Sequence, residues 1–95
     1  MIRHIVFFTV KRPENRDAVF EGLKLLETIP DSIRLEIRPN LNNDPISPEG
    51  PDFVVYGEFE DEAQLAAYKA HPLYTKSIEL VRPLRDTRTA ADFIS

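Results

Sequence analysis

The chain is 95 residues long, has no Cys and only two His, and carries a formal net charge of −4. This composition indicates one small domain, residues 1–95, and excludes a disulfide, a thiolate metal site and an all-protein zinc cage. Lys and Arg scattered along an acidic chain would not hold a nucleic acid, and without a leader or a membrane span we expect a cytoplasmic protein with no membrane partner.

Residues 2–10 (IRHIVFFTV) combine β-branched and aromatic side chains and predict a strand. One face of this strand carries His4 among apolar side chains, and the other carries Ile5 and Phe7. One face of an antiparallel sheet often meets water, yet both faces here are largely apolar. A single helical layer covers only one of them, so Ile5 and Phe7 predict that two copies pair sheet to sheet in a homodimer. A domain this small also gains stability from such pairing.

Residues 13–28 predict a helix, because Val19, Leu23 and Leu26 recur at helical spacing and form a core stripe. Gly22 lies within this helix, where glycine costs about 1 kcal/mol relative to alanine. Two explanations are open for it. The one we favour is a close contact between the helix and the sheet, and the other is room left for a ligand.

The middle of the chain predicts two strands separated by a long loop. Residues 32–39 (SIRLEIRP) alternate apolar and charged side chains, which is typical of a strand with one wet face at a sheet edge. Residues 40–51 are polar and contain three prolines and a glycine, so we expect an irregular loop that is the most mobile or variable segment. Residues 52–59 (DFVVYGEF) predict the next strand.

The C-terminal part predicts two helices. Asp61 and Gln64 resemble a capping pair that opens a helix over residues 61–70, and a His-Pro pair ends it. Residues 73–81 predict a further short helix.

Residues 84–94 (LRDTRTAADFI) predict a last strand with a weaker pattern than the others. The order of elements is then β-α-β-β-α-β with an extra short helix. This order is typical of an α+β fold of ferredoxin-like topology.

Four segments of the chain, taken in order, carry a family resemblance: MIRHIVFFTVK, SIRLEIRPNLN, AYKAHPLY and VRPLRDTRTAADF. Their order and spacing resemble the Dabb (stress-responsive A/B barrel) family over nearly the whole chain. The resemblance implies a ferredoxin-like dimer whose two sheets face each other in an α/β barrel. Most members of the family have no assigned activity.

One plant branch of this family is a polyketide cyclase, which closes a linear polyketide by intramolecular aldol condensation without a cofactor. That branch uses a first-strand His, a helix Tyr and a His that follows the His-Pro pair. By resemblance, the first two correspond to His4 and Tyr68, whereas the third corresponds to Tyr74. The catalytic-base position is therefore substituted here, because a phenol donates a hydrogen bond but is a poor general base near pH 7.

His4 and Tyr68 are the candidate catalytic residues. An imidazole buried on an apolar strand can act as an acid or a base near neutral pH, and the alternative for His4 is a core histidine bonded to a backbone carbonyl. Tyr68 is either a donor to a ligand carbonyl or an amphipathic core residue. The candidate ligand-binding residues are Val6, Phe8, Phe53, Val55, His71 and Tyr74. His71 is more simply explained as a helix-terminating residue.

Three functions from different classes are compatible with these residues. The first is a small-molecule-binding protein, or a cofactor-independent enzyme, for an apolar ligand with a carbonyl or a phenol. The second is a non-catalytic dimeric module, stress-related or accessory to a pathway. The third, by analogy of fold alone, is a cofactor-free monooxygenase. We expect no metal or cofactor, and an open cavity beside His4 would favour the first function over the second.

Overall fold

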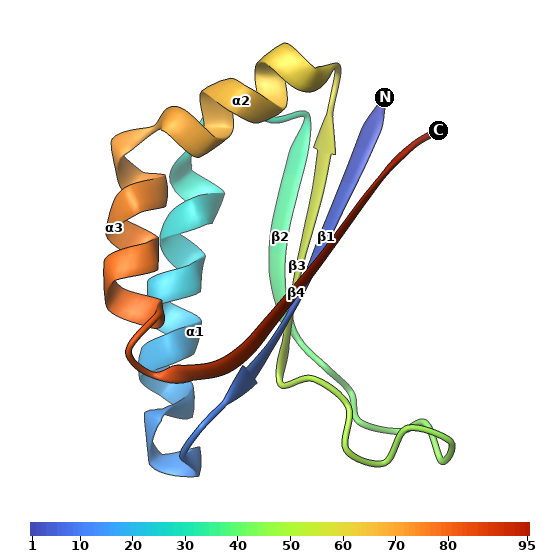
Figure 1. Cartoon of the computed structure of the whole chain (residues 1–95), viewed down its shortest axis with the longest axis vertical. Helices are drawn as coiled ribbons and strands as arrows, with labels where there is room; N and C mark the ends of the chain where they lie inside the picture. The colour runs from blue at the N-terminus through green and yellow to red at the C-terminus, as the bar shows by residue number, and fades with distance from the viewer.

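The computed structural model covers all 95 residues and contains one four-stranded sheet and three α-helices (Figure 1). The elements in chain order are β1 (Ile2–Val10), α1 (Arg16–Lys24), β2 (Arg34–Pro39), β3 (Phe53–Phe59), α2 (Glu62–Ala70), α3 (Pro72–Val81) and β4 (Arg85–Ile94). The predicted order, including the extra short helix, is confirmed. No helix combines the length and the apolar character needed to cross a membrane.

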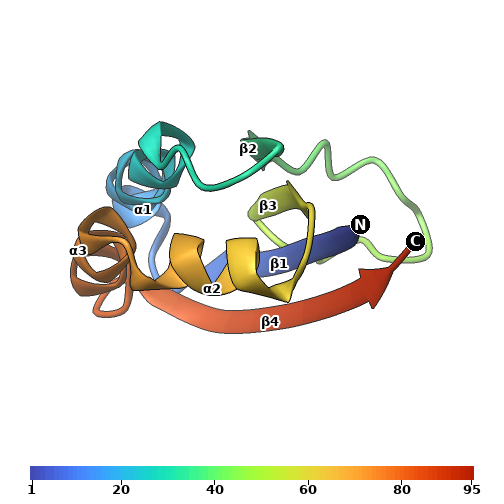
Figure 2. The same cartoon turned by 90° about the horizontal axis from the view of Figure 1, so that it is seen from above.

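The strands are arranged in the order β2-β3-β1-β4, and every neighbouring pair is antiparallel. Figure 2 shows this order across the sheet, with α1 and α3 beside it. β1 is central because both of its faces are apolar, whereas β2, with one charged face, forms an edge as predicted. β4 forms the other edge. The molecule therefore has the ferredoxin-like α+β fold.

The three helices lie on one face of the sheet, which Figure 1 shows edge-on. The core of 13 buried residues lies between the helices and this face. His4, Val6 and Phe8 of β1 point into that space and are buried. Their neighbours Ile5 and Phe7 lie on the opposite face, which we call the open face, where Ile5 is half-buried and Phe7 is exposed.

The predicted N-terminal helix is α-helical only in its middle. Short 3-10 turns flank α1 at Pro13–Asn15 and Leu25–Thr28. Pro13 lacks an N–H and suits the first turn, so the helix begins there. Val19 and Leu23 are buried, as the predicted core stripe requires.

Gly22 brings α1 close to α3 rather than to the sheet. A Cβ atom on Gly22 would lie 2.9 Å from a methyl group of Val81 and 3.3 Å from Cβ of Leu80. The hydroxyl of Ser77 also donates to the Gly22 carbonyl over 2.8 Å. Close packing was the favoured explanation, but the predicted helix–sheet contact is wrong. The two helices come into contact at Gly22 because both lie on the same face of the sheet.

The segment between β2 and β3 has no helix or strand, which confirms the predicted irregular loop. The side chain of Asn40 donates to the carbonyl of Pro51 over 2.8 Å and so ties the two ends of the loop together. Leu41 and Ile46 are 83% and 90% exposed. Figure 1 shows the loop extending beyond the sheet on the side away from the helices. Its mobility stays a prediction.

The predicted cap of α2 is confirmed. The carboxylate of Asp61 accepts from the backbone N–H of Gln64 over 2.8 Å, and the Gln64 side chain accepts from the N–H of Glu60 over 2.7 Å. His71 has an extended backbone before Pro72, which separates α2 from α3.

Candidate functional site

A cavity of about 350 Å³ lies between the helices and the helix-facing side of the sheet, with walls from β1, β3, β4 and all three helices. Nine of its 15 lining residues are hydrophobic. Val6, Phe8 and Val55, which the sequence suggested as ligand contacts, are among them. Alternation along β1 and β3 places these side chains on the inner face of the sheet.

His4, the third residue of β1, is buried and also lines the cavity. In the sheet it is paired with Asp92 of β4, and Nδ1 of the imidazole is hydrogen-bonded to Oδ1 of Asp92. The partner is therefore a side-chain carboxylate and not the backbone carbonyl of the structural alternative. An ionised carboxylate can only accept, so the neutral ring carries its proton on Nδ1 and has a free lone pair on Nε2.

Nε2 of His4 is reached from the cavity. It makes no hydrogen bond with the protein, and the chain has no fully enclosed polar side-chain atom without a partner. An atom that is neither bonded nor enclosed must touch open space, and the open space beside His4 is the cavity. The phenolic oxygen of Tyr68 meets the same conditions, so it is also available to a ligand.

Tyr68 projects from α2 with its ring centroid 6.3 Å from that of His4. Burial raises the pKa of the Tyr68 phenol, with a further contribution from Tyr74 and an opposing one from Arg88. Tyr68 therefore keeps its proton at neutral pH and can donate a hydrogen bond. Tyr74 of α3 packs edge-on against Tyr68, with 5.2 Å between the centroids, and lines the cavity too. The fold thus brings His4, Tyr68 and Tyr74 together as neighbours around the cavity.

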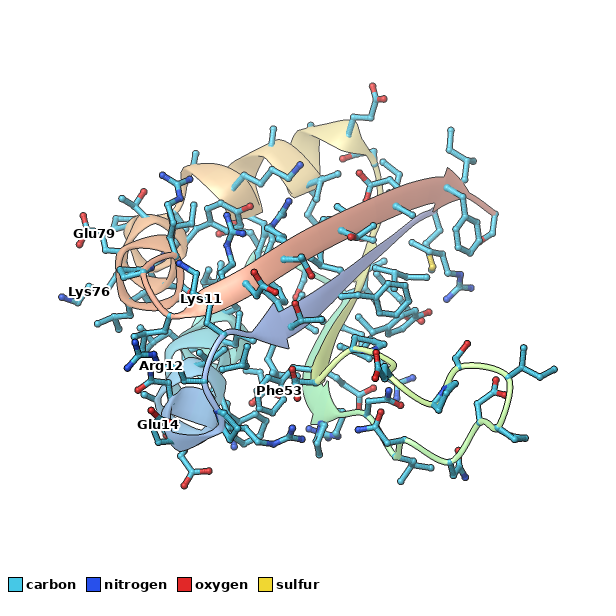
Figure 3. All side chains as sticks on the ribbon, turned by 60° about the horizontal axis from the view of Figure 1, so that its bottom comes forward. Lys11, Arg12, Glu14, Phe53, Lys76 and Glu79 are labelled. Carbon is cyan, nitrogen blue, oxygen red and sulfur yellow. The ribbon has the colours of Figure 1, made fainter.

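Two of the suggested ligand contacts lie elsewhere. Phe53 stacks on Phe20 at 5.2 Å, with the guanidinium of Arg16 4.9 Å from its ring, and Figure 3 shows it at the end of the sheet beside α1. Nδ1 of His71 accepts from the backbone N–H of Leu73 over 3.1 Å and so caps α3. Neither residue lines the cavity.

Neither the cationic side chains of the cavity wall nor the carboxylate bonded to His4 was predicted from the sequence. Asp92 was not linked to His4, because the register between strands far apart in sequence is not visible in either strand. The cavity also receives four cationic side chains and one hydroxyl: Lys69, Ser77, Arg82, Arg85 and Arg88. The three arginines in the short segment 82–88 are the sequence feature from which a cationic site could have been predicted. No group of three or more His, Cys, Asp or Glu side chains is placed to hold a metal ion.

Known structures share this architecture. A dimeric ferredoxin-like protein of unknown function from Thermobifida fusca YX is 26% identical, with a TM-score of 0.79 over 97% of this chain and 88% of that one. A Dabb family protein with a ferredoxin-like fold from Mesorhizobium loti is 22% identical, with a TM-score of 0.77 over 99% and 95% of the two chains. A protein from Nitrosomonas europaea, provisionally called an antibiotic biosynthesis monooxygenase, is 20% identical, with a TM-score of 0.81 over 100% and 98%.

No protein of curated function matches the sequence. The family model for the Stress responsive A/B Barrel Domain, in contrast, matches residues 2–95. The match covers nearly the whole chain and agrees with the order of strands and helices, so this protein belongs to the Dabb family.

Proposed function

We propose that this protein binds a small, mostly apolar molecule with a carbonyl or a phenol in the cavity beside His4, and that it acts on this molecule by acid–base chemistry without a cofactor. The observation that carries the proposal is the buried imidazole of His4, which is hydrogen-bonded to Asp92 through Nδ1 and has a free Nε2 that is reached from the cavity. An open cavity at this place also favours a ligand over a filled structural core.

The arrangement suits abstraction of a proton next to a carbonyl. Nε2 of His4 accepts the proton from the substrate carbon, and the electron pair of the broken C–H bond moves toward the carbonyl oxygen. The O–H of Tyr68 donates to that oxygen as negative charge develops. Asp92 holds the tautomer and stabilises the imidazolium ion. His4 then returns the proton, either to the same molecule or to the oxygen of a new bond.

Tyr74 is proposed as a hydrogen-bond donor. The cyclase branch of the family has a histidine at this position, so the role of base falls to His4 in this chain. Tyr74 packs edge-on against Tyr68 and keeps its phenol in the cavity wall. The similarity to the protein from Nitrosomonas europaea is one of fold at 20% identity. Because one fold hosts many activities, it does not support oxygen chemistry here.

We further propose that the working unit is a homodimer formed through the open face. Phe7 and Phe93 are 41% and 50% exposed and come from the adjacent strands β1 and β4. The loop that carries the exposed Leu41 and Ile46 extends on the same side of the sheet (Figure 1). The Thermobifida fusca relative is a dimer. Apolar surface on a sheet and on the loop beside it supports an interface with a second copy.

The proposal is tested in two steps. A thermal-shift screen against aromatic and polyketide-like carbonyl compounds first identifies a ligand, since binding at a hundred times Kd stabilises the folded state by about 2.7 kcal/mol. His4→Ala is then expected to slow turnover about 10²–10⁴-fold while the variant stays folded. His71→Ala, which removes the other imidazole of the chain, is the control. Unchanged turnover in His4→Ala would overturn the catalytic role and leave a binding module.

A further inference from the structure

The charge of the cavity wall is opposite to that of the whole chain. The chain has 16 acidic and 12 basic residues, yet four of the basic residues line the cavity and no acidic residue does. Lys69 comes from α2, Arg82 directly follows α3, and Arg85 and Arg88 belong to β4. The fold thus brings positive charge from three elements to one opening.

These four cations have no partner within the protein. The arginines that form ion pairs with carboxylates are Arg3, Arg16, Arg34 and Arg38, and all four lie outside the cavity. No carboxylate lies within 4.0 Å of the charged atoms of Lys69, Arg82, Arg85 or Arg88. Their positive charge is therefore left for a group that the chain does not itself supply.

The nearest acidic residues in sequence do not neutralise this cluster. Asp86, between Arg85 and Arg88, forms no ion pair and does not line the cavity. Glu79, one helical turn before Arg82, points away from the cavity on the outer side of α3, as does Lys76 (Figure 3). Acidic side chains close enough in sequence to pair are thus directed elsewhere.

The cations lie at the mouth of the cavity and the imidazole of His4 lies at its base. Arg88 is exposed, whereas His4 is buried. In the register of β1 with β4, Arg88 is paired with Phe8 and Asp92 with His4, and both face the helices. Arg88 and Asp92 are four positions apart along the strand, which corresponds to about 13 Å between their Cα atoms, and the arginine side chain spans part of that distance. A ligand can therefore present different chemical groups to the two ends.

We infer that the ligand is an organic acid, with an apolar body inside the cavity and a carboxylate held at the mouth by Arg85 and Arg88. Lys69 and Arg82 add to the positive field that attracts it. The guanidinium fork matches a carboxylate in geometry as well as in charge. This inference rests on the proposed function, because it names the substrate class of the same cavity.

Octanoate is a suitable probe, with octanol as its neutral counterpart of similar shape. Calorimetric titration of the wild-type protein at low ionic strength is expected to show octanoate binding at least about tenfold more tightly than octanol. Raising the salt concentration should weaken octanoate binding and leave octanol binding unchanged, because Arg88 is exposed and Arg85 is half-buried, so that salt screens their charge.

Two double variants and one control variant test whether Arg85 and Arg88 cause the preference for octanoate. The double variant Arg85→Gln/Arg88→Gln should lose most of the preference for octanoate, whereas Arg85→Lys/Arg88→Lys should keep part of it. Lys76→Gln removes a positive charge from the same side of the molecule but outside the cavity, and it should leave the affinities for octanoate and octanol unchanged. Equal affinity for octanoate and octanol in the wild type, or equal losses for both probes in the Gln variant, would overturn the inference.

A third probe and one further variant distinguish a wrong assignment of the anion from a wrong assignment of the catalytic residue. Octyl phosphate binding about tenfold more tightly than octanoate would show that the cavity prefers a phosphate, which overturns the carboxylate assignment. His4→Ala should keep the preference for octanoate, since this residue lies at the other end of the cavity. Preference for octanoate together with unchanged turnover in His4→Ala supports the anion site and removes only the proposed catalysis.

Discussion

The two faces of β1 differ in burial and in their polar contacts although they belong to the same nine residues. On the helix side, Val6 is buried and His4 meets a cavity. On the open face, Phe7 is 41% exposed. A shift of one position along the strand thus moves a side chain from a site suited to chemistry to a surface suited to assembly. A substitution on one face of β1 can therefore change the cavity without changing the open face, and a substitution on the other face can do the reverse.

The polar groups of the two faces differ as well. On the helix side, the polar contact of β1 is the His4–Asp92 pair at the cavity. On the open face, one Nη atom of Arg3 donates to the hydroxyl of Tyr56 and to the carboxylate of Glu58, each over 2.6 Å. The hydroxyl of Tyr56 donates to the same carboxylate over 2.6 Å. The stability that the open face contributes should therefore respond to changes in polarity and pH, whereas the close packing of Gly22 against Val81 on the helix side should respond to changes in volume.

The largest effect is expected from making the open face polar. Ile5→Ser/Phe7→Ser should dissociate the dimer, because full burial of these two side chains contributes about 3–6 kcal/mol per subunit. Sedimentation velocity at micromolar concentration measures the result. Leu80→Ser is the matched control, since Leu80 is 42% exposed but lies on α3, on the other side of the sheet. A double variant that still sediments as a dimer would rule out this interface.

A smaller effect is expected from added volume on the helix side. Gly22→Ala should lower the free energy of unfolding by about 1 kcal/mol, because the overpacking against Val81 exceeds the gain in helix propensity. Urea denaturation measures the change. The double variant Gly22→Ala/Val81→Ala should lack this contact, so it should have a higher free energy of unfolding than Val81→Ala alone. A more stable Gly22→Ala variant would show that α1 and α3 can move apart freely.

The smallest effect concerns the pH dependence of the open face. The hydrogen bond from Tyr56 lowers the pKa of Glu58, with help from Arg3 and Arg34 and against the effect of desolvation. A carboxyl group whose pKa is lower in the folded state stabilises the fold above its unfolded value of 4.5, and this contribution is lost as the pH falls through the folded value.

Glu58→Gln should therefore be less stable than the wild type at neutral pH and closer to it at about pH 3. Glu49→Gln, in the exposed loop and without an ion pair, is the control. Denaturation curves at the two pH values give the comparison. A difference that does not change with pH would mean that Glu58 acts through shape and not through charge.

Part of the site was predictable because its members follow local patterns. Alternation along β1 places His4, Val6 and Phe8 on one face, and all three line the cavity. The family resemblance pointed to Tyr68, which lies beside them. Phe53 obeys the same alternation on β3, but it lies at the end of the strand, where Phe20 covers it. Alternation along a strand predicts on which face of the sheet a side chain lies, but it does not predict how far that side chain is from the site.

The sequence by itself determined the order of the elements, the inner face of β1 and the cap of α2, because each depends on residues only a few positions apart. Only the tertiary structure decided that Asp92 pairs with His4, 88 positions away, and that Gly22 meets α3. It also decided that Lys69 and Arg88 share one opening. Strand register and the distance between helices result from packing the whole core at once, so no single segment encodes them.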